Sequence, residues 1–182
     1  EYSWKAKAPM LYGRFDFAYD GQNIKMLEYN ADTPTGLLEA SVAQWHWIEE
    51  VQNVPHRDQF NSIHEDLIER WKQLFAPKSL VHFAACQEAG REDWGNLEYL
   101  MDTAFQAGLS VSELSMENLG WDQTQFVDLN DQAIHHLFKL YPWEWIWEEN
   151  FSTFIKPDSQ WIEPCWKMLL SNKAILVELW KQ

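Results

Sequence analysis

The sequence predicts an α/β fold in which a layered mixed sheet is flanked by helices. Strand-like segments alternate along the chain with helix-like segments, which is the pattern of parallel strands joined by helical crossovers. The chain has 182 residues and is 46% hydrophobic, close to the usual globular value. A chain of this length can bury about 70% of its unfolded surface. We therefore expect residues 1–182 to form a single α/β domain.

A hairpin is the first predicted part of the sheet. Residues 14–20 alternate between aromatic side chains and polar or small ones, and this period of two is typical of a strand. The segment 20–23, Asp-Gly-Gln-Asn, has the composition of a turn, and residues 24–30 form the predicted returning strand. We expect a three-residue loop with Gly21 at the position that requires a positive φ.

The register of this hairpin decides which side chains share a face. The three-residue loop places Asp20 opposite Ile24. One face is then polar and has two cross-strand pairs, Asp16 with Glu28 and Arg14 with Asn30. The opposite face is apolar and is expected to belong to the core, and its members are Phe15, Phe17, Leu27 and Tyr29.

The remaining elements follow from apolar periodicity and from helix and strand terminators. In chain order we predict helices over 37–51 and 58–75, a buried strand over 80–85, a helix over 97–107, strands over 109–114 and 125–129, a helix over 131–140, a strand over 161–166 and a helix over 172–181. Pro77 follows the second helix, and Gly108 is the expected left-handed residue after the third.

Charge excludes two classes of partner. The chain has 28 Asp and Glu against 14 Lys and Arg, a net charge of −14, which would repel nucleic acid and an anionic membrane. A cation, an amine, or a nucleotide that enters with its metal is compatible with this charge. No apolar run approaches the roughly 20 residues of a bilayer span, and the first residues lack the basic-then-apolar pattern of a secretory leader, so we expect neither a membrane span nor secretion. Cys86 and Cys165, far apart, suit buried thiols in a reducing cytoplasm.

The polar face of the hairpin is a candidate metal site. Like charges directly opposite one another destabilise a sheet, so the pairing of Asp16 with Glu28 needs an explanation. Mg²⁺ binds one or two carboxylates and takes its other ligands from water and phosphate. Asn30 adds an amide oxygen, and Arg14 could stabilise a phosphoryl oxygen beside the metal. The alternative is an Arg–Asp–Glu salt-bridge cluster on an exposed sheet face.

The segment 31–36, Ala-Asp-Thr-Pro-Thr-Gly, follows the hairpin and leads into the next helix. Its two hydroxyls and its free backbone N–H groups at a helix start suit a carboxylate or a phosphate. The alternative is that Thr35 only caps the helix. Glu88 lies at the carboxyl end of the strand 80–85, the usual ligand edge of an α/β sheet, or is simply a solvated loop acid.

Other patterns are weaker. The glycine spacing of residues 90–95 is that of a phosphate loop, but the acids inside it would repel phosphate. The spacing of the six histidines argues against a zinc site. The tryptophans of 143–147 suggest a sugar-stacking platform, and Asp16 with Glu28 could serve a glycosidase. A carbohydrate enzyme or binding module, and a non-catalytic interaction domain, therefore remain as alternative functions.

Several stretches together resemble the glutathionylspermidine synthase family. They are Leu11-Tyr12-Gly13-Arg14-Phe15-Asp16, Leu27-Glu28-Tyr29-Asn30-Ala31-Asp32-Thr33-Pro34-Thr35, and Trp161-Ile162-Glu163-Pro164 through Ser171-Asn172-Lys173-Ala174. Phe126-Val127-Asp128-Leu129 and Tyr141-Pro142-Trp143-Glu144 also fit, so the resemblance extends over nearly the whole chain. It is greatest to the stand-alone bacterial members, which lack an amidase domain.

The resemblance implies an ATP-grasp-like ligase that uses ATP and Mg²⁺ to join a peptide-like carboxylate to an amine, such as a polyamine. By position, Arg14 matches the arginine at the reacting phosphoryl group. Together with Asp16, which acts through magnesium, it would contact the ATP phosphates. The implied magnesium ligands are Asp16, Glu28 and Asn30.

The resemblance also assigns substrate contacts. Thr33 and Thr35 match residues that hold the glutathione-like acid, and both are Thr where glutathionylspermidine synthases have Ser. Glu88 lies near the acidic substrate contacts, although Gln87 departs from the paired acids of the family. Family members are longer at both ends. We therefore expect this chain to be a central piece that docks on an ATP-binding part and is inactive alone.

Overall fold

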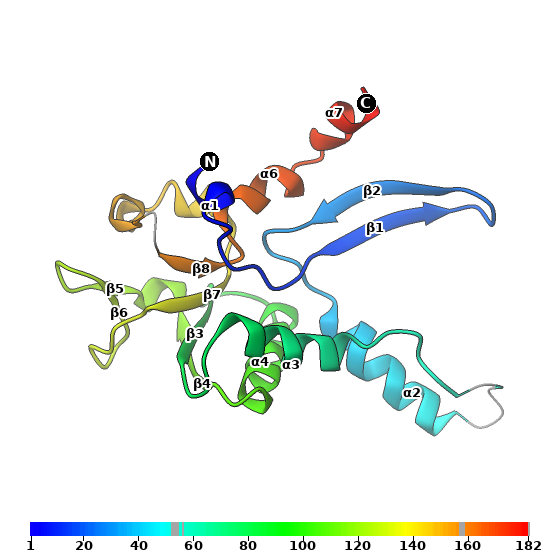
Figure 1. Cartoon of the computed structure of the whole chain (residues 1–182), viewed down its shortest axis with the longest axis horizontal. Helices are drawn as coiled ribbons and strands as arrows, with labels where there is room; N and C mark the ends of the chain where they lie inside the picture. The colour runs from blue at the N-terminus through cyan, green and yellow to red at the C-terminus, as the bar shows by residue number, and fades with distance from the viewer. Residues whose placement is uncertain (52–54, 56, 157–158, 182) are drawn as a thin grey trace.

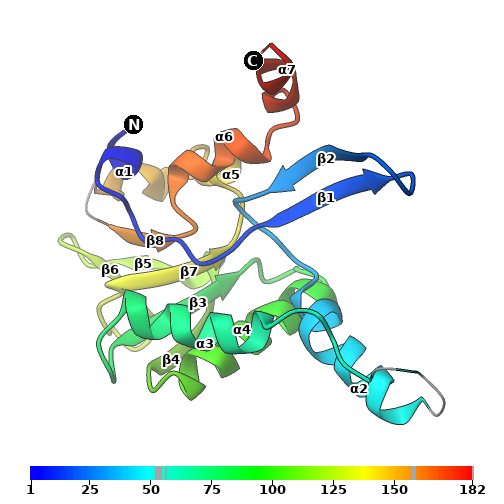
Figure 2. The ribbon, with the colours of Figure 1, turned by 45° about the vertical axis from the view of Figure 1, so that its right-hand side comes forward.

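The centre of the molecule is a four-stranded parallel sheet with helices on both faces (Figures 1 and 2). A computed structural model describes residues 1–51, 55, 57–156 and 159–181. The strand order is β4-β3-β7-β8, and the strands span Ser110–Ser115 (β4), Leu80–Ala85 (β3), His136–Leu140 (β7) and Gln160–Ile162 (β8). The predicted α/β class, with a layered sheet and flanking helices, is confirmed. The four strands of the main sheet, predicted to be mixed, are all parallel, and the antiparallel pairs form separate two-stranded sheets.

Two helices, α3 (Ile63–Leu74) and α4 (Arg91–Gln106), cover one face of this sheet. In α4 the side chains of Leu97, Leu100 and Ala104 are buried, a spacing that places them on one helical face. Trp71 of α3 is completely buried in the same cluster, and its indole N–H donates to the Thr103 hydroxyl over 3.0 Å. The helices α3 and α4 therefore pack together against this face of the sheet.

The other face packs against short elements from the second half of the chain. Its core contains Phe126, Trp143, Ile146 and Trp161. The short elements of this half are the turns η2 (Met116–Asn118), η3 (Asn150–Phe154) and η4 (Cys165–Lys167), the strands β5 (Gly120–Trp121) and β6 (Phe126–Val127), and the helices α5 (Trp143–Ile146), α6 (Met168–Ser171) and α7 (Ile175–Trp180). A further short helix, α1 (Tyr2–Lys5), lies near the start of the chain. None of the helices within the described ranges is long and apolar enough to cross a bilayer.

The hairpin of β1 (Arg14–Tyr19) and β2 (Ile24–Asn30) forms a separate two-stranded sheet that projects from the body (Figure 1). Gly21 has a φ of 96°, as predicted. The strands close at Tyr19 opposite Ile24, so the expected pairing of Asp20 with Ile24 is wrong. Asp20 instead accepts hydrogen bonds from the backbone N–H groups of residues 22 and 23, which lengthens the turn.

A β-bulge between Asp16 and Phe17 absorbs that extra residue. Beyond the bulge, Asp16 lies opposite Glu28 and Arg14 opposite Asn30, so the predicted polar face is confirmed.

The apolar face of the hairpin is exposed, and the expectation that it belongs to the core is wrong. Phe15, Phe17 and Leu27 are 48%, 55% and 51% exposed. The Phe15 ring stacks on the Tyr29 ring at a centroid distance of 4.0 Å, and Tyr29 is half-buried. The hairpin extends away from the four-stranded sheet, so its apolar side chains pack mainly on one another.

The largest error in secondary structure concerns residues 131–140, predicted as a helix. Residues 136–140 are β7, a central strand whose last four side chains are buried. Other predicted elements differ in their bounds. The predicted helix 37–51 contains a π-helical segment η1 (Glu39–Ala43) and α2 (Gln44–Glu50), and α3 and α4 begin at residues 63 and 91. The predicted strand 125–129 contains only β6, the predicted strand 161–166 contains parts of β8 and η4, and the predicted helix 172–181 contains only α7. Gly108 has the predicted positive φ after α4.

Candidate functional site

Arg14 organises the polar face of the hairpin. Its guanidinium donates to both oxygens of Asp16, with Nε–Oδ1 at 2.9 Å and Nη2–Oδ2 at 3.2 Å. Nη2 also lies 4.0 Å from Oε1 of Glu28. The Asn30 amide donates to the same Glu28 oxygen over 2.6 Å. The four predicted residues are thus in mutual contact, and their functional roles remain predictions.

Lys173 joins this cluster from the segment between α6 and α7. Its ammonium lies 2.7 Å from Oε2 of Glu28. Hydrogen bonds from Lys173 and then Asn30 lower the pKa of Glu28, and the Arg14 hydrogen bond lowers that of Asp16. Two cations therefore balance two carboxylates, as the salt-bridge alternative describes.

The donor set of this face also suits a hard cation. The side chains of Asp16 and Glu28 are 38% and 21% exposed, so their oxygens are accessible. A half-turn of the Asn30 amide would exchange its nitrogen and oxygen without moving the backbone. Within the described ranges no three His, Cys, Asp or Glu side chains gather to hold a metal. A Mg²⁺ ion here would therefore rely on the amide and on oxygens from water or phosphate, as Mg²⁺ commonly does.

Thr35, in the segment after β2, contacts Arg14. The Nη1 group of Arg14 donates to both the hydroxyl and the carbonyl oxygen of Thr35, each over 3.3 Å. The N–H of Leu37, at the start of the helix, donates instead to the Asn96 side chain over 3.1 Å. Gly36 has a φ of 85°, which allows the chain to turn beside Arg14. Thr35 therefore belongs to the hairpin site rather than acting as a simple helix cap.

Thr33 and Glu88, predicted from distant parts of the sequence, line one cavity of about 370 Å³. Asp93, Tyr141 and Trp145 line it as well, and its lining contains no Lys or Arg. Burial, and then repulsion from Glu92, raise the pKa of Asp93. The cavity combines carboxylates with aromatic rings, a combination that favours a cationic ligand.

Two buried ion pairs hold the chain on either side of the hairpin, and neither was predicted. Asp32 lies 2.7 Å from the ammonium of Lys139. Glu163 lies 2.6 Å from that of Lys167 and accepts the Tyr12 N–H over 2.9 Å. Burial lowers the pKa of Lys139 and raises that of Glu163.

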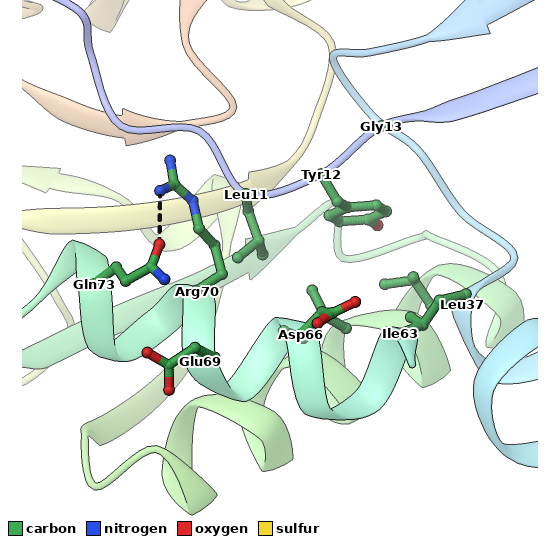
Figure 3. A pocket seen from close by; sticks show the side chains of 10 residues that line it. Leu11, Tyr12, Gly13, Leu37, Ile63, Asp66, Glu69, Arg70 and Gln73 are labelled. Carbon is green, nitrogen blue, oxygen red and sulfur yellow. Dashed lines mark hydrogen bonds between the residues drawn. The ribbon is translucent and has the colours of Figure 1, made fainter. Parts of the chain in front are cut away.

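A groove of about 420 Å³ lies between α3 and the segment that leads into β1 (Figure 3). Leu11, Tyr12 and Gly13 form one wall, and Asp66 and Arg70 of α3 belong to the other. The Arg70 guanidinium is bound to the Met10 carbonyl at 2.9 Å. None of the predicted site residues is among those that line this groove, so we assign it no role.

Comparison with known proteins identifies the family. All of residues 1–182 match the family described as glutathionylspermidine synthase pre-ATP-grasp. The chain belongs to this family. The resemblance noted in the sequence is therefore confirmed, and the chain is a pre-ATP-grasp domain of the glutathionylspermidine synthase family.

Individual relatives agree with this assignment. The chain is 54% identical to a "Putative acid--amine ligase" of Haemophilus influenzae, over 99% of this chain and 47% of that protein. It is 24% identical to the bifunctional glutathionylspermidine synthetase/amidase of Escherichia coli, over 98% of this chain and 33% of that protein. The chain is 27% identical to trypanothione synthetase of Crithidia fasciculata, over 96% of this chain and 31% of that protein. The chain therefore spans less than half the length of these relatives.

A solved structure shows the same fold at low sequence identity. It is titled "Putative gamma-glutamylcysteine synthetase" from Methylobacillus flagellatus and aligns with a TM-score of 0.52 at 10% identity. The alignment covers 77% of this chain and 34% of that one.

Proposed function

We propose that the chain is part of an ATP-dependent ligase that joins a carboxylic acid to an amine. A substrate carboxylate oxygen attacks the γ-phosphorus of ATP, and ADP leaves. The amine nitrogen then attacks the acyl carbon, phosphate leaves, and the nitrogen loses a proton to give the amide. The observation that supports this proposal most is the gathering of Arg14, Asp16, Glu28, Asn30 and Thr35 in one polar cluster.

Each residue of this face has a proposed role. Asp16, Glu28 and Asn30 would hold Mg²⁺, which when bound supplies charge neutralisation for the ATP phosphates. Arg14 would direct its guanidinium toward the oxygens of the transferred phosphoryl group, where negative charge develops. Its present hydrogen bonds to Asp16 and Thr35 already orient the planar group at the edge of the proposed metal site.

The two substrates would meet beside the segment 31–36. We propose that the hydroxyls of Thr33 and Thr35 bind the peptide-like acid. The amine would enter the neighbouring cavity as a cation, where Glu88 and Asp93 supply negative charge and Trp145 supplies an aromatic face. A polyamine fits this cavity and the net charge of −14. Cys86 and Cys165 are free thiols but only half-buried, so the expectation that both are buried is wrong. Free thiols are compatible with the reducing cytoplasm that we propose for this ligase.

The ATP-binding part would come from the remainder of a longer ligase. Leu169 and Leu179 are 65% and 52% exposed, while Leu170 and Ile175 are half-buried. This C-terminal apolar surface, with the exposed apolar face of the hairpin, would dock on that part.

The alternatives have less support from the structure. Trp145 and Trp147 are 55% and 47% exposed, which would suit a sugar-binding module. In a glycosidase the two carboxylates flank an open cleft. Here Asp16 and Glu28 contact Arg14 and Lys173 instead.

The test is ligase activity of the intact protein with ATP, Mg²⁺ and panels of peptide acids and amines. We expect ADP and amide to form in equal amounts. Glu28→Gln should lower kcat about 100-fold, because Mg²⁺ would lose a carboxylate ligand and would neutralise less of the charge that develops on the phosphoryl group. Asp20→Asn, at the tip of the same hairpin, is the matched control and should retain wild-type activity. Calorimetry that detects oligosaccharides but no Mg²⁺-dependent nucleotide would instead support the sugar-binding alternative and contradict the ligase.

A further inference from the structure

In the sequence, Asp32 lies between the proposed metal ligand Asn30 and the proposed substrate residue Thr33. Its side chain, however, binds neither the proposed metal nor the proposed substrate and contacts other parts of the chain. It is only 3% exposed. One carboxylate oxygen accepts a hydrogen bond from the ammonium of Lys139 over 2.7 Å, and the other accepts one from the backbone N–H of Trp143 over 2.8 Å. Both oxygens are therefore fixed by groups outside the hairpin.

The groups that hold Asp32 belong to the main sheet and to the helix that follows β7. Lys139 is completely buried in the central strand β7, and its ammonium lies 4.9 Å from the centre of the Trp143 ring. Ser171 of α6 adds a third anchor, because its hydroxyl accepts the N–H groups of Ala31 and Asp32 over 3.0 and 2.9 Å. The end of the hairpin strand β2 is thus fastened to β7, α5 and α6.

The hairpin needs such a fastening. It is a two-stranded sheet separate from the main sheet, and an isolated pair of strands is only marginally stable. Its apolar face is largely exposed, so packing does little to fix its orientation. Directional hydrogen bonds at the strand end therefore decide where Asn30 and Thr33 lie relative to one another.

We propose that Asp32 is a positioning residue whose ion pair with Lys139 fixes the spacing between the metal end and the substrate end of the ligase site. This inference rests on the proposed function. A pair of hydrophobic side chains could stabilise the fold equally well. It would not hold the loop in one orientation, because a charge-assisted hydrogen bond is directional and hydrophobic contact is not.

The test separates positioning from folding through a double variant. Lys139→Met alone leaves a buried carboxylate without its cation and is expected to fold poorly. Asp32→Asn/Lys139→Met removes both charges at similar size and keeps an acceptor for the Trp143 N–H. We expect this double variant of the intact protein to melt near the wild-type temperature. Its kcat should fall about 100-fold, because a displacement of about 1 Å can cost that much. The KM for ATP should change little.

A second readout does not depend on the reaction. Hydrogen exchange followed by mass spectrometry should show faster exchange in residues 31–35 of the double variant, with peptides from β3 and β4 unchanged. The matched control is Asp128→Asn, another buried carboxylate, which accepts backbone N–H groups of residues 130 and 132 away from the proposed site. It should change neither kcat nor exchange in residues 31–35.

The outcomes distinguish this inference from the proposed function. A double variant that retains wild-type kcat and wild-type exchange in residues 31–35 would overturn the positioning role. A wild-type protein that forms no amide would contradict the ligase. The exchange measurement would then decide alone: faster exchange would support a fastened loop, and unchanged exchange would overturn it.

Discussion

Arg14 is the residue on which the proposed site depends most, because its guanidinium contacts two separate segments. Nε and Nη2 donate to Asp16 within β1, and Nη1 donates to Thr35 beyond β2. The planar fork therefore holds the hairpin and the segment 31–36 in one geometry. An ammonium has the same charge but cannot make this set of directed contacts.

We therefore expect Arg14→Lys in the intact protein to lower kcat about 100-fold while the affinity for ATP changes much less. Lysine keeps attraction to the phosphates but loses the orientation needed as charge develops. Steady-state kinetics with ATP and both substrates measures the two effects separately. An unchanged kcat would remove Arg14 from the mechanism.

A second prediction at this scale concerns Asp122, in the turn between β5 and β6. Hydrogen bonds from the Thr124 hydroxyl and from the N–H groups of residues 125 and 124 lower its pKa to about 2. A depressed pKa means that the folded state favours the carboxylate. Its stabilisation is therefore present above the unfolded pKa of 3.8 and is lost as the pH falls toward 2.

Titration of the Asp122 carboxyl carbon by NMR should show this midpoint near pH 2. In Thr124→Val, which lacks the hydroxyl, the midpoint should rise toward 3.8. An equal midpoint in both proteins would contradict the assigned cause.

At the scale of elements, the entry into β1 depends on a close contact between Gly13 and the Tyr29 ring. A Cβ atom at position 13 would lie 2.5 Å from Cε2 and from the hydroxyl of Tyr29. The ring has little room to retreat, because it stacks on Phe15 at 4.0 Å. Only glycine therefore fits between the half-buried segment 11–12 and the site residue Arg14.

Gly13→Ala should therefore destabilise the protein by about 1–3 kcal/mol through overpacking. Tyr29→Leu shortens the side chain and should relieve the clash, so the double variant should lose less stability than the two single variants together. Urea unfolding of the four proteins measures this coupling. Strictly additive losses would mean that the two side chains do not compete for space.

The hairpin also shows what a sequence can and cannot predict. Its polar face could be predicted because alternation in two strands depends on near neighbours in the sequence. The predicted turn was one residue too short, and the bulge after Asp16 compensated for that error at the site. The exposure of its apolar face could not be predicted, because it depends on the direction in which the whole hairpin projects from the body.

The unpredicted contacts share a physical cause. Asp32 and Lys139 are 107 residues apart, and Lys139 lies in a strand whose pattern was mistaken for a helix. The ladder with β3 and β8 on either side overrides the local periodicity of residues 136–140. Lys173 belongs to a segment that carries the family resemblance, but its contact with Glu28 could not be predicted. That contact depends on the packing of α6 beside β2 in the folded chain (Figure 1).

At the scale of the whole molecule, the two apolar surfaces and the proposed site point to the same conclusion. Phe15 and Phe17 lie on the reverse of the strand that has Arg14 and Asp16, and Leu179 belongs to α7 above the hairpin (Figure 1). Exposed apolar surface of this kind marks an interface. We therefore propose that the part that binds ATP packs around the hairpin and completes the site.

The last prediction concerns residues 1–182 expressed alone. The segment with phosphate-loop glycine spacing forms the start of α4 and has Glu92 and Asp93 in its first turn, where they would repel phosphate. The cations near the site, Arg14 and Lys173, are already paired with carboxylates. Mg²⁺ held by few protein oxygens depends on substrate phosphates for the rest of its ligands.

We therefore expect these residues alone to bind Mg²⁺ and ATP weakly and to consume no ATP above background with any acid and amine. Calorimetry and a phosphate-release assay measure the two expectations, with the intact protein as the positive control. Robust amide formation by residues 1–182 would mean that a complete ATP site lies within them. The apolar surfaces would then need a different partner from the one proposed.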